Sequence, residues 1–400
     1  MSAQDLAAPD TPQDSAARAV GLIGLTLALA YAVVLYGAYV GGHWLFDPQG
    51  RPIANDFVNV WAAGKLALEG HAADAYDWTL HKAMEVRAVG HAFDNYYGWH
   101  YPPMFFFAAA ILAQMPYAAA MPVWLGVTLL PYVAAMRGIV GERAGFFVAL
   151  GFPAGLWNAT AGQNGFLTAA LIGGTLGLME RHPALAGVCL GLLSYKPHFG
   201  LLFPIVLIAS RRWRVFITAA ITAFAMAAAS WIVFGHAAWQ AFFRWMPVTG
   251  GVVLGDGAAD WQRLQSLFGL IRSFGGGEAL AWSAQSALAV MLAIALAWLW
   301  RSRAVFELKA AALATGALLA TPYLYIYDLV ALAIPVAFLL RLALKRGFSA
   351  AEMIGLPALT LLLLAYPYAK TQVGFAAALV VALLIAQRAW TGARHTAVQN

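Results

Sequence analysis

Long apolar runs separated by short polar segments repeat along the whole chain. The first run covers residues 20–42, and comparable runs recur up to about residue 390. An α-helix needs about 20 apolar residues to cross a bilayer, and it satisfies its backbone hydrogen bonds internally. The pattern therefore predicts an all-α polytopic membrane protein with about 10–12 membrane helices.

Two of the runs do not fit a simple crossing. Residues 101–137 are too long for one span and too short for three, and Pro116 and Pro122 interrupt them. Residues 183–210 carry Lys196, followed by a proline, at their centre. Irregular backbone at membrane depth is tolerated only beside protein or a water-filled cavity. We therefore expect short, broken or re-entrant helices in both stretches, with two half-helices meeting at the lysine.

Composition supports the membrane interpretation and narrows the chemistry. Of the 400 residues, 62% are hydrophobic and 10% are charged, whereas soluble proteins carry about 25% charged residues. The single cysteine, Cys189, lies inside an apolar run and excludes both an internal disulfide and a cysteine-rich metal site. The net charge of +6 comes from short basic clusters between apolar runs rather than from a basic patch, so no nucleic-acid partner is predicted.

The basic clusters also predict which side of the membrane each segment faces. Arg18 precedes the first run, which is longer than the apolar core of a secretory signal; this favours an uncleaved signal anchor over cleavage near residues 28–30. Residues 1–18 and 391–400 are then cytoplasmic tails of one transmembrane domain, residues 19–390. The other predicted cytoplasmic clusters are Arg137 with Arg143, Arg181, Arg211-Arg212-Trp213-Arg214, Arg301 with Arg303, Arg341 with Lys345-Arg346, and Arg388 with Arg394.

The segments on the opposite, outer side of the membrane hold most of the acidic residues. The predicted outer segments are residues 43–101, 158–164, 236–278, 321–328 and 366–371. Their acids are Asp47, Asp56, Asp74, Asp77, Asp94, Asp256, Asp260 and Asp328. In the first outer loop, residues 43–101, the patterns at 56–68 and 76–89 predict amphipathic helices, which we expect to lie on the outer membrane face.

Lys196 is the most informative single residue, because it lies at the centre of an apolar stretch. A lysine at mid-membrane costs about 2.5–3.5 kcal/mol, so it needs a partner or a water-filled cavity. Pro197 and His198 follow it, and a break here would gather the ammonium, the imidazole and freed backbone groups. We interpret the cluster as a phosphate-binding site. The alternative is a lysine that extends from a differently placed helix end to the membrane surface.

Asp56 follows the first predicted span and begins a helical pattern. An aspartate at this place is a good helix N-cap, which would account for it without any chemistry. The alternative is a general base, because a carboxylate at the membrane edge of an outer loop can reach a lipid-linked sugar. Position alone leaves both interpretations open.

Other polar residues fall on the same outer side, and a structural role would explain each of them alone. Together with Asp56 and Lys196 they predict one cavity that holds a base, cations and sugar-binding groups beside apolar helices. Arg263 and His198 are the further candidates for binding a phosphate. The candidates for binding a sugar or an acceptor are Asn55, His100, Tyr101, Gln163, Asn164, Gln265, Tyr327 and Asp328.

Such a cavity suits a sugar donor whose leaving group is a lipid phosphate. A glycosidase needs two carboxylates because its leaving group must be protonated. A sugar phosphate leaves as a stable anion, so one base and cations suffice, together with an apolar groove for the prenyl tail. No second catalytic carboxylate is required.

A series of short motifs carries a resemblance to a known family. In chain order these are Asn55-Asp56-Phe57, Trp61-Ala62-Ala63-Gly64 with Gly70, Ala75-Tyr76-Asp77, Tyr101-Pro102-Pro103, Gly162-Gln163-Asn164, Ala186-Gly187 with Gly191, Lys196-Pro197, Arg211-Arg212-Trp213-Arg214, Gln265-Ser266 with Arg272, and Thr321-Pro322. Their order and spacing over about residues 50–340 resemble glycosyltransferase family 87, within the C superfamily of polyprenyl-phosphate-dependent membrane glycosyltransferases.

The resemblance implies an inverting, metal-independent and cofactor-free transfer, with Asp56 as the base. It implies a polyprenyl-phosphate-linked sugar as donor and a glycolipid or cell-envelope glycan as acceptor, at a site facing the periplasm of a bacterial inner membrane. Phosphatidylinositol-mannoside α-mannosyltransferases are the similar enzymes, so mannose is the default sugar. Where many family members carry a histidine after the late proline motif, this chain has Tyr325-Ile326-Tyr327-Asp328, and the sugar and acceptor therefore stay open.

Two alternatives belong to other classes of protein. A transporter or flippase of a lipid-linked sugar would also use a broken helix with a lysine near the midplane. Transporters, however, usually show internal repeats, and this chain shows none, while its first outer loop is long and helical. A structural scaffold has no use for a lysine at mid-membrane. The transferase is the interpretation that the sequence favours.

Overall fold

The computed structural model describes residues 12–257 and 260–398, and helices make up most of that part of the chain. No β-strand forms among these residues. The predicted all-α polytopic membrane fold is therefore confirmed. Residues 1–11 and 399–400, which belong to the two predicted cytoplasmic tails, lie outside the described residues.

Six helical segments among the described residues are long and apolar enough to cross a membrane. They are α1 (Pro12–Val40), α5 (Tyr117–Val140), α11 (Trp213–Gly250), α13 (Glu278–Arg301), the segment Ile326–Arg346 and α18 (Val373–Val398). Shorter helices pack between them: α6 (Glu142–Gly151), α7 (Pro153–Ala161), α8 (Gly165–Leu178), α14 (Phe306–Leu319) and α16 (Ala350–Leu364). The segment Ile326–Arg346 itself consists of η7 (Ile326–Leu332) and α15 (Ala333–Arg346).

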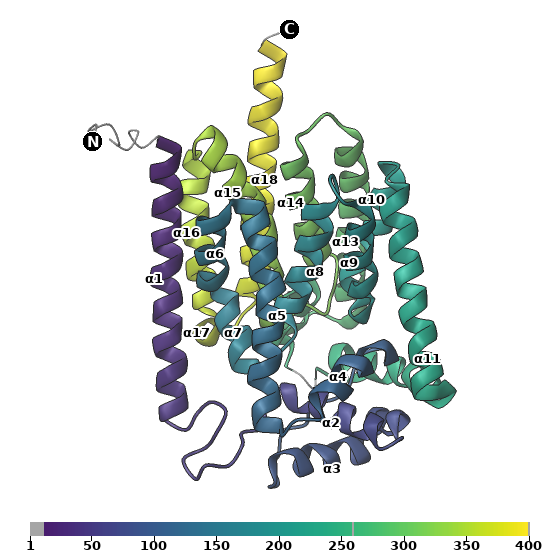
Figure 1. Ribbon diagram of the computed structural model, residues 1–400. Helices are drawn as coiled ribbons and strands as arrows, with labels where there is room; N and C mark the ends of the chain where they lie inside the picture. The colour runs from purple at the N-terminus through teal and green to yellow at the C-terminus, as the bar shows by residue number, and fades with distance from the viewer. Residues whose placement is uncertain (1–11, 258–259, 399–400) are drawn as a thin grey trace, which may run out of the picture.

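The stretch around Lys196 forms two half-helices, as the sequence predicts. Helix α9 (Pro183–Leu192) and helix α10 (Leu202–Ala209) are joined by two short 3-10 turns. Lys196 lies between these turns with non-helical φ and ψ of −128° and 73°. Both half-helices lie beside α11 (Figure 1). The freed backbone groups of the break thus face protein rather than lipid.

The stretch 101–137 is also broken, but at one place rather than two. A short helix, α4 (Phe106–Leu112), ends before Pro116, and α5 then begins at Tyr117. Pro122 lies inside α5 instead of interrupting it. Pro122 is the sixth residue of α5, beyond the first four positions whose N–H groups have no intrahelical partner, so it removes one helical hydrogen bond without ending the helix.

Glycines bring the membrane helices into close contact. Gly187 and Gly191 lie one turn apart on α9 and face α11, where a β-carbon at Gly187 would come within 2.7 Å of the Val215 carbonyl. On the other side of the bundle, Gly24 of α1 leaves no room for a β-carbon against the backbone of Phe147 in α6. Lipid tails are as apolar as the helices, so such close packing is what holds membrane helices together.

The first outer loop folds at one end of the bundle, below the membrane helices as drawn in Figure 1. It contains α2 (Phe57–Leu68), η1 (Ala72–Tyr76) and α3 (Trp78–Val89), close to the two predicted helices. Helix α2 differs from the expected membrane-surface helix, because most of its residues are buried. Its Gly64 lies directly against the Ala109 backbone of α4. We call this end of the molecule the cavity end; α1 begins and α18 ends at the opposite end (Figure 1).

Candidate functional site

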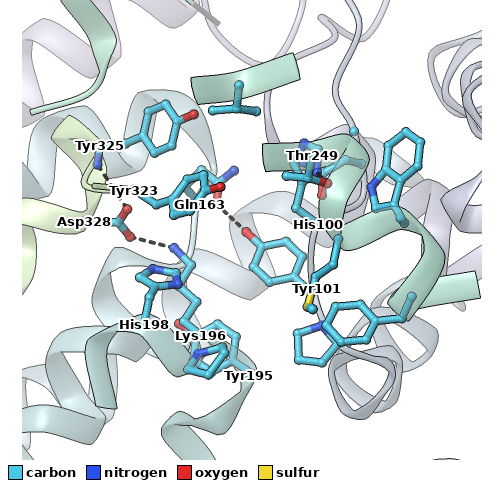
Figure 2. Close-up of a pocket in the computed structure, with 18 of the residues that line it drawn as sticks. His100, Tyr101, Gln163, Tyr195, Lys196, His198, Thr249, Tyr323, Tyr325 and Asp328 are labelled. Atoms are coloured by element: carbon cyan, nitrogen blue, oxygen red, sulfur yellow. Dashed lines mark hydrogen bonds and ion pairs between the residues drawn. The ribbon is translucent and has the colours of Figure 1, made fainter. Parts of the chain in front are cut away.

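A cavity of about 310 Å³ opens at the cavity end, where several parts of the chain meet. Most of its walls come from residues 98–102 after α3, the break between α9 and α10, the final turns of α11, and residues 323–328 before and in η7, and Asn59 and Gln163 complete them. Figure 2 shows the polar side chains of these segments pointing into the space between them. The cavity therefore joins the first outer loop to the re-entrant half-helices.

Lys196 lies in the wall of this cavity and is paired with Asp328. The Nζ atom donates a hydrogen bond of 2.6 Å to Asp328 Oδ1, and the two residues are 6% and 1% exposed. Asp328 Oδ2 also accepts a bond of 3.3 Å from the backbone N–H of Tyr325. The lysine is thus held at the break and does not extend to a membrane surface. The ion pair supplies the partner that a buried ammonium needs.

Aromatic rings surround the rest of the Lys196 ammonium. Its Nζ lies 5.3 Å from the ring centre of Tyr327 and 5.9 Å from those of Tyr101 and Phe199. His198 lines the same cavity, and its buried Nε2 has no hydrogen-bond partner among the described residues. The break therefore offers a cation, ring faces and an unused imidazole nitrogen to a ligand.

Gln163 and Asn164 lie in the turn between α7 and α8. They form a buried hydrogen-bond network with Tyr101. The Tyr101 hydroxyl donates to Gln163 Oε1 at 3.1 Å and accepts from Asn164 Nδ2 at 2.8 Å, and Figure 2 shows the first of these contacts. Asn164 Oδ1 accepts from Trp124 Nε1 at 3.1 Å. Because its Oε1 accepts the hydrogen bond from Tyr101, the amide of Gln163 must present its NH₂ group on the other side.

Asp56 lies directly before α2, but its side chain does not cap the helix. Asn55 accepts the hydrogen bond from the Phe57 N–H instead, at 3.1 Å. Among the described residues, no basic side chain forms an ion pair with the Asp56 carboxylate. The N-cap interpretation of Asp56 therefore does not account for its side chain, which is partly buried and left without a structural partner of this kind.

The surroundings of Asp56 connect it to the cavity. Burial raises the pKa of the Asp56 carboxyl to about 6, while the charges of Arg263 and Lys196 and a hydrogen bond from Gln163 act in the opposite direction. The negative charge of Asp328 raises this pKa further. Side chains must be near one another to interact in this way, so Asp56 and Lys196 face the same region. Asp56 itself is not among the residues that line the cavity, whereas Gln163 is.

The remaining predicted site residues separate into two groups. His100 lines the cavity, stacks on Trp245 and bonds to Thr249 Oγ1 at 3.1 Å. Tyr327 lines it as well. Arg263 is exposed and does not line the cavity, although its charge acts on Asp56.

Asn55 and Gln265 lie outside the cavity and have structural contacts. The Asn55 amide bonds to the Tyr117 hydroxyl at 3.1 Å and to the Met121 sulfur at 3.0 Å. Gln265 Oε1 accepts from the Gly374 N–H at 2.7 Å, and this bond fastens the segment that follows α11 to α18. Both side chains therefore connect a loop to a neighbouring helix.

The final part of α11 is a wall of the cavity that the sequence does not predict. Phe242, Trp245 and Thr249 line the cavity from residues 236–250, which the sequence assigns to an outer loop. Gly235 has φ of 81° and ψ of 168°, a conformation that favours glycine and bends the helix at this point. The aromatic content of residues 239–245 is the one signal that could have pointed to a buried wall.

Metal binding finds no support in the described residues. No group of three or more His, Cys, Asp or Glu side chains is arranged there to hold a metal ion. Metal-independent transfer stays a prediction. The chemistry that the cavity can supply is proton transfer by a carboxylate and stabilisation of an anion by Lys196 and the adjacent groups.

Comparison with known proteins gives one match. The sequence model of glycosyltransferase family 87 matches residues 99–322, which is more than half of the chain. The matched region contains His100, Gln163 and Lys196, whereas Asp56 and Asp328 lie outside it. No curated protein and no solved structure shows a significant match.

Proposed function

Because the chain belongs to glycosyltransferase family 87 and is therefore an integral membrane glycosyltransferase, we propose that it transfers a sugar from a polyprenyl-phosphate donor. The acceptor is a hydroxyl of a lipid-linked or cell-envelope glycan, and the reaction inverts the anomeric centre. Asp56 is the general base. One observation carries the proposal: Asp56 lies near enough to Lys196, in the cavity wall, for the charge of the ammonium to act on the Asp56 carboxylate.

The two carboxylates near the cavity differ in their availability for proton transfer. Both oxygens of Asp328 are engaged, one by Lys196 at 2.6 Å and one by the Tyr325 N–H at 3.3 Å. Asp56 has no comparable partner, and a pKa of about 6 leaves it largely ionised but still basic at pH 7. These contacts support Asp56, rather than Asp328, as the group that takes the proton from the acceptor hydroxyl.

The leaving group of the donor is a prenyl phosphate, which needs a cation. Within the described residues, Asp328 is the hydrogen-bond acceptor of Lys196 Nζ, and an ammonium has three donors. The remaining donors are available to a phosphate oxygen. His198 adds a donor from the same break, and Arg263 adds positive charge near Asp56. The negative charge that develops on the phosphate as the sugar leaves is thus stabilised without a metal.

A groove beside the cavity suits the prenyl tail of such a donor. It has a volume of about 340 Å³ and lies between α9, α10 and α11. Its walls are small or apolar, among them Leu190, Gly200 and Ala220. Pro197 lines both the groove and the cavity, so a phosphate held at Lys196 lies next to the entrance of the groove. An isoprenoid chain and its phosphate therefore fit the two neighbouring spaces.

The aromatic and amide groups of the cavity are proposed to bind the sugar and the acceptor. His100, Tyr101 and Tyr327 line it and present ring faces and polar edges of the kind that sugars bind. Gln163 and Asn164, tied to Tyr101, fix the wall nearest Asp56. Mannose is the proposed sugar, and the periplasmic side of a bacterial inner membrane is the proposed location of the cavity end.

Replacing Asp56 tests the proposal. Asp56→Asn keeps the shape of the side chain but removes the base, so sugar transfer should fall by about 10²–10⁴-fold. Purified protein is incubated with polyprenyl-phosphate sugars and an acceptor extract, and the products are followed by mass spectrometry. Asp77→Asn is the matched control: Asp77 caps α3 in the same loop, bonding to the Thr79 and Leu80 N–H groups at 2.9 and 3.0 Å.

The control variant should retain transfer, because asparagine also caps helices. A folded Asp56→Asn protein with wild-type transfer would show that Asp56 is not the base. If instead the wild-type protein moved labelled lipid-linked sugar across proteoliposome membranes and formed no glycosylated product, a flippase would be the better description of the cavity.

A further inference from the structure

The Lys196–Asp328 pair places a fixed negative charge inside the cavity that is proposed to bind a phosphate. Asp328 is 1% exposed, and its second oxygen holds the Tyr325 N–H at the start of η7. Withdrawing the carboxylate from the cavity would therefore break the hydrogen bond that caps η7. Lys196, by contrast, is a flexible side chain with donors to spare. A phosphate that binds Lys196 must share it with a carboxylate that cannot leave.

The transfer step changes the charge of the ligand at this place. In the donor, the phosphate is a diester with one negative charge. The acceptor oxygen forms a bond to the anomeric carbon, the bond from that carbon to the phosphate oxygen breaks, and its electron pair stays on the phosphate. The acceptor proton passes to Asp56. The prenyl phosphate that remains is a monoester, whose second ionisation has a pKa near about 6, so it is mainly a dianion at neutral pH.

We propose that Asp328 acts as a fixed counter-charge that weakens binding of the dianionic prenyl phosphate more than binding of the monoanionic donor, and so promotes release of the product. The inference rests on the proposed function, since it concerns the leaving group of that reaction. Coulomb repulsion grows with the charge of the ligand, and the repulsion is little screened because both members of the pair are buried. Asp328 is thus a positioning residue for Lys196 and also sets the cavity's preference between donor and product.

A purely structural role for Asp328 predicts the opposite result. If the carboxylate served only to hold Lys196 in place, its removal would loosen the ammonium and weaken the binding of every phosphate. If it is a counter-charge, its removal strengthens binding, and most for the dianion. The direction of the change therefore separates the two roles.

The test measures binding rather than transfer. Wild-type and Asp328→Asn proteins in nanodiscs are titrated at pH 8 with polyprenyl phosphate and with its methyl diester, which carries one negative charge. Asp328→Asn should bind the monoester about tenfold more tightly and the diester only about threefold more tightly. Asp47→Asn is the matched control, because Asp47 pairs with Arg51 at 2.7 Å outside the cavity. Weaker binding of the monoester, or an equal gain for both ligands, would overturn the proposal.

The wild-type protein supplies a second measurement, in case Asp328→Asn does not fold. Relative to the diester, the monoester should bind more weakly at pH 8 than at pH 5, where it is a monoanion. Other groups near the cavity also affect binding: Asp56, His198 and His100 titrate, and Lys196, Asp328 and Arg263 carry charge. Measuring the diester at both pH values corrects for their effect. A monoester that binds more tightly as a dianion would contradict the inference.

Sugar transfer is assayed separately on the same wild-type preparation. Absent transfer with intact, charge-dependent binding would count against the proposed function alone. Absent binding of polyprenyl phosphate would count against the counter-charge.

Discussion

The carboxylate of Asp56 has its proton affinity set by a few neighbouring groups. Burial raises its pKa, and the charge of Arg263 is the largest effect in the opposite direction. The hydrogen bond from Gln163 and the charge of Lys196 lower the pKa further, whereas the charge of Asp328 raises it. Because Arg263 is exposed and does not line the cavity, it can be replaced with little disturbance of the packing.

The pH dependence of transfer should therefore report on Asp56. The base must be ionised, so kcat/KM should fall as the pH drops through about 6. Arg263→Gln removes a positive charge that favours the ionised carboxylate, and this should move the acidic limb upward by about 0.5–1 pH unit. Arg51→Gln, at an exposed arginine paired with Asp47, is the control and should leave the profile in place. A limb that stays or moves downward would exclude an influence of Arg263 on the base.

The importance of a single residue could be predicted from the sequence where its charge is costly inside a membrane. A lysine in an apolar stretch must have a partner, and so Lys196 stands out in the sequence. The identity of the partner does not, because Asp328 is 132 residues away and only the fold brings it to 2.6 Å. Gln265 was predicted as a binding residue, but a polar residue in a loop can equally hold two segments together. Its bond to the Gly374 N–H supports this structural role.

At the scale of helices, the break between α9 and α10 positions the Lys196 ammonium and also creates the groove beside it. Small residues open the groove, since a larger side chain would occupy the same space. Gly200 lies in the groove, and a β-carbon there would meet no heavy atom within 4 Å. Gly191 also lines the groove but packs against α11, so its replacement would disturb the helix contact instead.

Filling the groove should make the enzyme sensitive to the length of the prenyl chain. Gly200→Leu places a side chain in the path proposed for the tail, so the KM for a long-chain donor should rise by about tenfold, the scale of one lost or obstructed apolar contact. A donor with only one or two isoprene units should be nearly unaffected. Gly126→Leu, at an exposed glycine of α5 with equal free space, is the matched control. Equal effects on short and long donors would place the tail elsewhere.

Helices were predictable from apolar runs and prolines, but their bends and burial were not. The two half-helices around Lys196 follow from a proline at the centre of an apolar stretch. The bend at Gly235 does not, because glycine is common in straight membrane helices, and only its φ of 81° reveals the change of direction. The burial of His81 and Glu85, which are fully buried and 3.6 Å apart on α3, could not be predicted either. Helix α3 is polar, and other segments of the chain bury these two side chains.

At the scale of the whole molecule, the two ends differ both in shape and in charge. The cavity and the first outer loop lie at one end, and α1 begins and α18 ends at the other (Figure 1). At that other end, acidic residues pair with the basic clusters: Glu142 with Arg137, Glu180 with Arg212, and Glu307 with Arg341. The positive-inside rule therefore predicts that this basic end faces the cytoplasm and that the cavity end faces the outer side.

Cysteine accessibility tests this orientation, because the chain has only one native cysteine to remove. In a Cys189→Ala background, Asp94→Cys places a thiol on the first outer loop and Arg303→Cys places one between α13 and α14; both positions are exposed. In intact spheroplasts, a membrane-impermeant maleimide should label position 94, and position 303 only after permeabilisation. The background protein without added cysteines controls for unspecific labelling.

The reverse pattern would contradict the orientation and would also change the chemistry. In the proposed reaction, a prenyl-phosphate sugar reaches Lys196 from the leaflet at the cavity end, so that end must face the compartment where both the donor sugar and the acceptor are displayed. If position 94 faced the cytoplasm, the same cavity would have to use acceptors made there, and the proposed cell-envelope glycan would be excluded even if Asp56 and Lys196 acted as described. The orientation of the bundle thus decides which acceptors the base can reach.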